Sequence, residues 1–326
     1  MNAALTIAVV VIGRNEGARL AACLRSVLAQ VDRVVYVDSG STDGSLTRAR
    51  DLGVEVISLD ASTPFTAARG RNAGFFHWRN QPDPPDLVQF LDGDCLLIDG
   101  WLTAGVNALQ ADAGLGLVTG WRAEIDKGNS IYNALCDFEW RRPAGLIKAC
   151  GGDMLVRSTA FAKTGGFNPD IIAAEDDEFC VRLRKSGWQL RRVPVEMSRH
   201  DAAMTRFSSW WQRAVRSGHG FAQVGHLHPD YFLAERRRVL LFGLILPLLF
   251  VLGLLLSCLL SALVLGLYGL SFLRTVQGLK AAGLPLPKAL HHSVFLSLSK
   301  LPNMIGIITY WWRRLRRQNM NIIEYK

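Results

Sequence analysis

Thirty-five consecutive residues between Arg238 and Arg274 carry no charge, and this run constrains the fold more than any other feature of the sequence. Most of these residues are Leu, Val, Gly or Phe. One membrane-spanning helix needs about 20 apolar residues, so the run is too long for a single helix perpendicular to the bilayer. Divided in two, it provides roughly 16 or 17 residues for each span, with a turn near Ser257–Ser261. The sequence therefore favours a transmembrane helical hairpin over a single span.

Basic residues flank this run on both sides. Arg236, Arg237 and Arg238 precede it, and Arg274 and Lys280 are the first charged residues after it. An excess of Lys and Arg marks the cytoplasmic side of a membrane protein, so both flanks are expected there, together with the domain that precedes the run. Two flanks on one side require an even number of spans, as in a hairpin.

The net charge divides the chain at the same place. Residues 236–326 contain twelve Lys or Arg and one acid, a charge of +11, whereas residues 1–235 contain 25 basic and 27 acidic residues. The basic character therefore belongs to the tail, where it suits membrane lipids, and it argues against nucleic acid as a partner of the first domain. Within the tail, the apolar stretch from Leu290 to Trp312 is broken by Lys300 and Pro302, so we interpret it as interfacial rather than spanning.

The cysteines of the chain are scattered, with no C-x-x-C motif and no paired spacing. This usage predicts buried free thiols in a reducing compartment rather than a disulfide framework or a zinc site. The six residues are Cys23, Cys95, Cys136, Cys150, Cys180 and Cys258.

Residues 1–125 alternate between predicted strands and helices. The first apolar run is short and lacks a basic flank, so we expect a buried strand there and no signal peptide. Regular alternation of this kind predicts an α/β fold with a doubly wound, mostly parallel sheet. Strands are expected at 6–12, 33–37, 54–59 and 87–91, and helices at 16–28, from about 41, and at 67–78.

Residues 126–235 are less regular. Helices are expected at 130–141 and 176–186, and a strand at 154–156. The sequence thus predicts four parts, which are 1–125, 126–235, a hairpin at 236–274 and a basic interfacial tail at 275–326.

Two carboxylates close the hydrophobic run Leu87–Leu91, in the triplet Asp92-Gly93-Asp94. Ligands of open α/β sheets bind at the carboxyl ends of strands, where this triplet is expected to lie. Hard divalent cations such as Mg²⁺ or Mn²⁺ prefer carboxylate oxygens of this kind. An ordinary Asp-Gly turn is the alternative.

Three further motifs carry polar side chains at expected helix starts. The loop from Asp38 to Ser45 suits an anion near a helix N-terminus or an Asx-type turn that caps the helix. The arginines of Ala68–Gly74 suit phosphate or a solvated face. Four acids in the row Glu175–Glu178 repel one another and raise the proton affinity of at least one, as a general base requires, or they only complement the helix dipole.

These motifs resemble those of the family 2 inverting glycosyltransferases of the GT-A fold, in the order seen in that family. The resemblance covers roughly residues 5 to 220. The ending Ile322–Lys326 after a membrane hairpin resembles bacterial envelope-polysaccharide members. The matching segments are Val11–Glu16, Val37–Gly44, Arg69–Asn72, Asp92–Asp94 and Glu175-Asp176.

The resemblance implies a nucleotide-diphosphate sugar donor, a cation and an inverting displacement. Residues 1–125 would bind the donor and residues 126–235 the acceptor, a lipid-linked glycan, at the cytoplasmic face of the inner (plasma) membrane. Asp176 would be the catalytic base and Asp94, with Asp92, would hold Mg²⁺ or Mn²⁺. The other implied residues are Asn15, Glu16, Asp38, Arg71 and Asp92 on the donor side and Asp153, Glu175 and Trp211 on the acceptor side.

One departure from the family pattern bears on the product. Processive relatives carry Gln-x-x-Arg-Trp, whereas here Gln212 is followed by Arg213-Ala214-Val215-Arg216 without the tryptophan. We therefore expect a single addition. The preceding His200-Asp201 pair is expected to close over the donor or to rest on the membrane. A polyprenyl-phosphate glycosyltransferase, a nucleotidyltransferase and a non-catalytic nucleotide-sugar-binding protein are the alternative functions.

Overall fold

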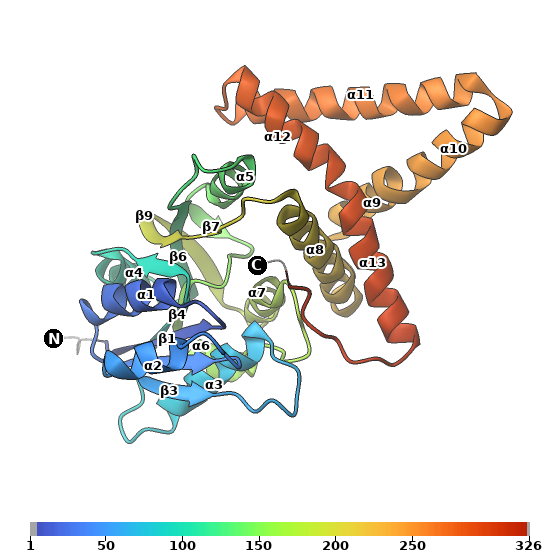
Figure 1. Cartoon of the computed structure of the whole chain (residues 1–326). Helices are drawn as coiled ribbons and strands as arrows, with labels where there is room; N and C mark the ends of the chain where they lie inside the picture. The colour runs from blue at the N-terminus through green and yellow to red at the C-terminus, as the bar shows by residue number, and fades with distance from the viewer. Residues whose placement is uncertain (1–4, 325–326) are drawn as a thin grey trace. The chain divides into compact units, whose positions relative to one another are not determined.

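A computed structural model describes residues 5–324 (Figure 1). They form two compact units, the first made of residues up to 128 together with 136–203, and the second of 129–135 together with the residues from 204 onward. The boundary predicted after residue 235 therefore differs from the division that the structure shows. The last two residues of the Ile322–Lys326 motif lie outside the described residues.

The first unit is built on one mixed sheet. Its strands follow the order β3-β2-β1-β4-β8-β6-β9-β5, with β7 paired to β9. Neighbouring strands from β3 to β4 are parallel, as the alternating pattern predicted, whereas β8 is antiparallel to both β4 and β6. The strands are β1 (Ile7–Gly13), β2 (Val34–Asp38), β3 (Glu55–Ser58), β4 (Leu87–Asp92), β5 (Cys95–Leu97), β6 (Leu115–Glu124), β7 (Gly145–Ile147), β8 (Met154–Arg157) and β9 (Gln189–His200).

Helices cover both faces of this sheet, which confirms the doubly wound arrangement. Val10 of β1 packs in one core with residues of α3, α6 and α7, and its neighbours Val9 and Val11 pack in a second core with α1 and α4. One strand contributes to both cores because its successive side chains point to opposite faces of the sheet. The helices are α1 (Ala18–Leu28), α2 (Ser45–Asp51), α3 (Ala67–Arg79), α4 (Trp101–Ala111), α5 (Ile131–Trp140, which begins in the second unit), α6 (Ser158–Thr164) and α7 (Glu175–Lys185).

Strand register brings the polar motifs to one edge of the sheet. Gly13 at the end of β1 lies opposite Asp38 of β2, and Ile12 lies opposite Asp92 of β4. At the other end of the strand order, β5 pairs antiparallel with β9, so that Cys95 lies opposite His200. Residues from distant parts of the sequence therefore meet beyond the carboxyl end of β4.

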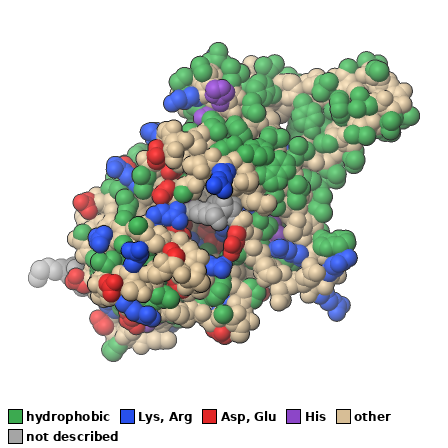
Figure 2. All heavy atoms as spheres, viewed as in Figure 1, with side chains coloured by type: hydrophobic (Ala, Val, Ile, Leu, Met, Phe, Trp, Pro, Cys, Tyr) green, Lys and Arg blue, Asp and Glu red, His purple; other side chains and the backbone are tan. Residues whose placement is uncertain are grey.

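The second unit is helical. The continuous helix Leu233–Leu256 and the helix Cys258–Ala281 are each 24 residues long and apolar enough to cross a membrane by length and composition. They are longer than the predicted spans because they continue into the flanking arginine and lysine segments. Many of their apolar side chains are exposed, among them Leu255 and Leu259, and Figure 2 shows hydrophobic atoms over this region. The break at Ser257 agrees with the predicted turn. The helices are α8 (Phe207–Leu227), α9 (Leu233–Leu240), a π-helical turn (Leu241–Ile245), α10 (Leu246–Leu256), α11 (Cys258–Ala281), α12 (Leu286–Leu298) and α13 (Lys300–Leu315).

A close helix crossing explains where the second unit begins. A Cβ atom on Gly218 of α8 would lie 1.9 Å from the carbonyl oxygen of Asn303, and one on Gly306 of α13 would lie 2.0 Å from that of Val215. Only glycine permits such an approach. Because α8 packs so tightly on α13, residues 207–227 join the C-terminal helices rather than the sheet.

Candidate active site

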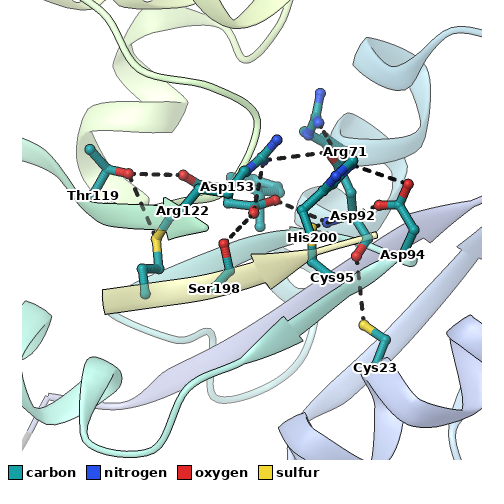
Figure 3. A network of polar contacts seen from close by, with 12 residues as sticks. Cys23, Arg71, Asp92, Asp94, Cys95, Thr119, Arg122, Asp153, Ser198 and His200 are labelled. Atoms are coloured by element: carbon teal, nitrogen blue, oxygen red, sulfur yellow. Dashed lines mark hydrogen bonds and ion pairs between the residues drawn. The ribbon is translucent and has the colours of Figure 1, made fainter. Parts of the chain in front are cut away.

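Asp92 ends β4 and Asp94 precedes β5, and both belong to the polar network drawn in Figure 3. Asp92 is partly exposed and faces two guanidinium groups, with Arg71 Nη2 2.7 Å from Oδ1 and Arg122 Nη2 3.6 Å from Oδ2. The burial of Asp92 opposes ionisation, but Arg71 and Arg122 outweigh it and hold its pKa below the usual value. Asp92 is therefore a carboxylate at neutral pH.

Asp94 is buried and faces a histidine. Nε2 of His200 lies 3.3 Å from Asp94 Oδ2, and Nδ1 of the same ring lies 3.7 Å from Oε2 of Glu124. Burial alone would lower the pKa of His200, but Asp94 and Glu124 raise it above its ordinary value. The sequence interpretation placed His200 over the donor or on the membrane, whereas the structure places it inside the first unit beside Asp94.

These side chains fit a divalent cation. Ligand atoms of Asp94, Cys95 and His200 all lie within 4.8 Å of one another, as do those of Asp92, Cys95 and Asp153. Burial and the neighbouring carboxylates raise the pKa of Cys95, which favours the neutral thiol, and hard divalent cations prefer oxygen ligands to sulfur. The remaining oxygen and imidazole donors suit Mn²⁺ and are compatible with Mg²⁺. Asp94 and His200 would thus hold the ion, and Asp92 would offer a further carboxylate oxygen to it.

Arg71 of α3 ties the metal side of the site to α7. Its two terminal nitrogens each lie 2.7 Å from a carboxylate, Nη2 from Asp92 and Nη1 from Glu175. Burial would lower the pKa of Arg71, but these carboxylates keep it raised and the group charged. A Cβ on Gly152 would lie 2.0 Å from Arg71 Nη2, so the buried guanidinium rests directly on that glycine. Arg71 is thus enclosed by carboxylates and backbone rather than open to solvent.

Asp176 stands at the start of α7, in the row of acids that the sequence singled out. Removal from bulk water is the largest cause of a strongly raised pKa for Asp176, and repulsion from Glu175 and Asp177 adds to it. Glu175 is paired with Arg71, and Glu178 forms an ion pair of 2.7 Å with Arg182. Asp176 therefore has the proton affinity that a general base requires.

Asp153 and Arg122 form a buried support beneath these groups. Asp153 Oδ2 accepts a hydrogen bond from Ser198 at 2.7 Å and forms an ion pair of 2.8 Å with Arg122 Nη2. Its Oδ1 accepts a hydrogen bond from the Asp92 backbone N–H at 3.2 Å. The guanidinium of Arg122 also lies over the ring of Trp140, 5.3 Å from its centroid. Asp153 was expected to face the acceptor, but it is only 1% exposed. No motif in the sequence marked Arg122.

The donor-side residues of the first two strands lie in neighbouring loops. Asp38 is buried, and its carboxylate accepts hydrogen bonds from the Tyr36 hydroxyl and the amides of Gly40 and Ser41. This is the Asx-type turn that was the alternative interpretation of the loop. Asn15 has a left-handed φ of 56° and joins the two loops, since its backbone N–H donates to Ser41 Oγ at 2.9 Å.

The remaining predicted residues are Glu16 and Trp211, and Glu16 lies beside the turn between Asp92 and Asp94, since a Cβ on Gly93 would be 3.4 Å from its Cγ. Glu16 forms an ion pair of 2.7 Å with Arg19, one turn along the chain. Trp211 belongs to α8 of the second unit, where its ring packs on Phe207 with centroids 5.7 Å apart. The structure brings Asp92, Asp94, Asp153, Arg71, Glu175 and Asp176 together within the first unit.

Comparison with known proteins agrees with this arrangement. Residues 8–159 match the family Glycosyl transferase family 2, and residues 142–301 match Glycosyl transferase family group 2. The chain belongs to glycosyl transferase family 2. Two glycosyltransferases are similar in sequence. Pre-mycofactocin glycosyltransferase of Mycobacterium tuberculosis is 28% identical over 242 residues, which are 69% of this chain and 48% of that protein. Glycosyltransferase AglE of Haloferax volcanii is 25% identical over 226 residues, which are 64% of this chain and 71% of AglE.

A solved structure shows the same fold. The mannosyltransferase PcManGT from Pyrobaculum calidifontis, in complex with GDP-Man and Mn²⁺, aligns with a TM-score of 0.59 at 17% identity and covers 96% of this chain and 89% of that one. The expected GT-A type of sheet is thereby confirmed. This family 2 chain spans about half the length of the mycobacterial relative.

Proposed function

We propose that this protein is a metal-dependent inverting glycosyltransferase that moves one sugar from a nucleotide-diphosphate donor to a lipid-linked glycan acceptor. The observation that carries the proposal is the meeting of two carboxylate sets at one sheet edge. Asp92 and Asp94 form one set and Glu175 with Asp176 the other, and Arg71 bridges them at 2.7 Å on each side. The family membership and the fold support the same reaction.

Each of these residues would have a separate role in the reaction. Asp94 and His200 would hold Mn²⁺ or Mg²⁺, and a bound cation offsets the charge that develops on the leaving diphosphate. Asp176 takes the proton of the acceptor hydroxyl. The oxygen then bonds to the anomeric carbon from the face opposite the nucleotide, and the bond from that carbon to the diphosphate breaks. No covalent enzyme intermediate is required.

The donor class is supported by the site and by the relatives. PcManGT was solved with GDP-Man and Mn²⁺. In this chain the loops after β1 and β2 present Asn15 and Asp38 at the same edge as Asp92. We propose that these loops receive the nucleoside and that Arg71 acts on the donor through Asp92, because its guanidinium is buried against that carboxylate.

The acceptor class and the location rest on the second unit. Its two long apolar helices and the basic residues at their ends suit an anionic membrane surface, which also attracts lipid-linked phosphate groups. We propose a hairpin in the inner membrane, with the catalytic unit in the cytoplasm and a role in envelope glycan or glycolipid synthesis.

The test is a product analysis. Purified protein is incubated with lipid extract, Mn²⁺ and a panel of nucleotide sugars, and the products are identified by mass. One added sugar on a lipid is the expected result. A ladder of many sugars would contradict single addition, and full activity on a soluble, lipid-free glycan would contradict the lipid acceptor.

A further inference from the structure

Arg192 of β9 is a buried arginine that no carboxylate pairs with among residues 5–324. Only 9% of the residue is exposed, and its Nη1 donates a hydrogen bond to the carbonyl oxygen of Pro143 at 3.3 Å. Nε and Nη2 make no hydrogen bond within the same residues, and of these two atoms only Nε is fully buried. Burial, together with the neighbouring Arg142, lowers the pKa of Arg192 below its ordinary value. Because arginine nevertheless stays protonated in proteins, a positive charge is held here without a counter-charge.

The arginines of the candidate active site differ from Arg192 in this respect. Arg71 lies 2.7 Å from each of two carboxylates, and Arg122 lies 2.8 Å from one and 3.6 Å from another. Moving a charge out of water is costly unless an opposite charge compensates it. The chain supplies that compensation to Arg71 and Arg122, whereas a bound anion would supply it to Arg192.

The surroundings of Arg192 are basic as well. β7 pairs with β9 so that Gly145 lies opposite Arg192. The segment that contains β7, residues 141–150, carries three basic residues and no acid. Two of them, Arg142 and Lys148, are exposed and form no ion pair within the part of the chain that the structure describes. Arg192 is therefore the buried end of a positive surface that Arg142 continues to the solvent.

This positive site lies on the side of the proposed base. Cys150 is close enough to Arg192 to affect its pKa, and the next residue is Gly151, on which a Cβ would lie 3.9 Å from Asp176 Oδ2. The donor loops follow β1 and β2, and three other strands separate β1 from β9 in the sheet. Arg192 also precedes His200 by eight residues of β9, about 26 Å along a regular strand. An anion at Arg192 would thus belong to the acceptor rather than to the nucleotide.

The charge of the site fits a phosphate ester. Guanidinium groups bind phosphate oxygens through parallel N–H donors. Two arginines without counter-charges, Arg142 and Arg192, match an anion with more than one negative charge. A diphosphate that joins a lipid to a glycan carries two, and a carboxylate only one.

We infer that Arg192 and Arg142 bind the phosphate or diphosphate group that joins lipid and glycan in the acceptor, apart from the hydroxyl that reacts at Asp176. This inference rests on the proposed transfer to a lipid-linked glycan and assigns the charged part of that acceptor to a site of its own. Both arginines hold the acceptor by its charge and take no part in making or breaking bonds.

The first test measures binding without the reaction. Farnesyl diphosphate, farnesol and inorganic phosphate are titrated calorimetrically into the full chain in detergent, with EDTA present to keep divalent cations away. We expect farnesyl diphosphate to bind, and farnesol and inorganic phosphate to bind at least about tenfold more weakly. Arg192→Gln should weaken farnesyl diphosphate by about tenfold or more, since charge-assisted hydrogen bonds are the strong ones. Arg192→Lys keeps the charge and should lose less.

The matched control is Arg50→Gln, which removes an exposed arginine of α2 and should leave the affinity for farnesyl diphosphate unchanged. Equal affinity of Arg192→Gln and the wild type would overturn the inference. Inorganic phosphate that binds as tightly as farnesyl diphosphate would overturn it too, because the site would then hold an adventitious ion only. A loss of GDP or UDP affinity in Arg192→Gln, measured with Mn²⁺, would assign the anion to the donor instead.

The second test separates ligand binding from a structural role. Arg192→Met keeps the length of the side chain and removes the charge. Since no carboxylate of the described residues loses a partner, we expect a melting temperature no lower than that of the wild type when no phosphate is present. A clearly lower melting temperature would show that the charge of Arg192 is compensated within the chain, which removes the reason to expect an anion there.

The third test uses the transfer reaction. With the lipid acceptor that product analysis identifies, Arg192→Gln should raise the acceptor KM about tenfold and leave kcat and the donor KM near their wild-type values. If the wild type transfers sugar and the acceptor KM does not change in Arg192→Gln, the inference fails and the glycosyltransferase proposal stands. If the wild type transfers sugar to no acceptor, the proposed function fails, and calorimetry with farnesyl diphosphate still decides whether Arg192 binds a lipid phosphate.

Discussion

Nε2 of His200 lies 3.3 Å from Oδ2 of Asp94, although one residue ends β9 and the other precedes β5. The antiparallel pairing of β5 with β9 creates this contact, because it sets Cys95 opposite His200. Both side chains are buried and both are attached to strand ends, so their donor atoms are held in place before any ion binds. Such preorganisation is what a metal site requires.

His200 is therefore predicted to be a ligand. His200→Ala should weaken Mn²⁺ binding by at least about tenfold, since loss of even a supporting contact typically costs 10–100-fold in metal affinity. Activity should recover in part at high Mn²⁺ concentration. The measurement is Mn²⁺ titration by electron paramagnetic resonance without donor, with the kinetic titration beside it. An unchanged Mn²⁺ titration would exclude His200 from the site.

Asp94 should be less tolerant of change. Asp94→Asn replaces a carboxylate with a neutral amide, which is a poorer ligand for a hard cation, and should remove most turnover while the protein stays folded. EDTA should abolish the activity of the wild type, and added Mn²⁺ or Mg²⁺ should restore that activity. Full activity in EDTA would refute the metal requirement.

The pH dependence of activity should report the ionisation of Asp176. A base acts only when deprotonated, and burial raises the pKa of the Asp176 carboxyl above the ordinary aspartate value of about 3.9. As the pH falls, activity should therefore begin to decline at a pH well above that ordinary value. Asp176→Asn should lower kcat by about 10²–10⁴, and nucleotide binding should survive. Normal turnover in Asp176→Asn would refute its role as the base and transfer that role to Asp177, because Glu175 is paired with Arg71.

The same shift has a consequence for stability. An acid whose folded pKa is raised favours the folded state only while it is protonated, so its contribution is lost as pH rises through that pKa. Asp176→Asn removes the repulsion from Glu175 and Asp177 and should unfold no more easily than the wild type at neutral pH. Urea unfolding at pH 7 measures this. A clearly destabilised variant would indicate a structural role for Asp176 instead.

The sequence predicted the parallel half of the fold because its signals are local. The strands β1 to β4 are short apolar runs between turns, and each lies within a few residues of its predicted bounds. The Asp-Gly-Asp triplet could be placed at a sheet edge for the same reason. Whether its residues bind a cation depended on partners that the local sequence does not reveal.

The rest of the site depends on contacts between distant segments. His200 and Arg122 meet the carboxylates only because β9 pairs antiparallel with β5 and parallel with β6, and pairing between strands so far apart in the sequence leaves no periodic signal. The buried position of Arg71 likewise depends on Gly152, far along the chain. The boundary predicted after residue 235 differs from the division into compact units for a similar reason, since glycines on α8 and α13 bring those helices together.

Gly152 should be intolerant of any side chain. In Gly152→Ala the new methyl group would displace the Arg71 guanidinium, to which it would lie 2.0 Å away, and break its pairs with Asp92 and Glu175. Breaking a buried ion pair typically costs about 3–5 kcal/mol. Urea unfolding of Gly152→Ala should show a loss of this order, while Gly151→Ala should unfold like the wild type. Equal stability of the two variants would contradict the described packing of Arg71.

Cys258 offers a test of the proposed hairpin. It follows the break at Ser257 and is exposed, whereas the other five cysteines are buried. A helix of 24 residues is about 36 Å long, enough to cross a hydrocarbon core of about 30 Å. With both basic flanks on the cytoplasmic side, Cys258 should react with a membrane-impermeant maleimide on right-side-out vesicles. In Cys258→Ser with Ala282→Cys, at the far end of α11, labelling should appear only after permeabilisation. Labelling of both positions from one side would show that α11 does not span the membrane, and the reverse pattern would invert the orientation.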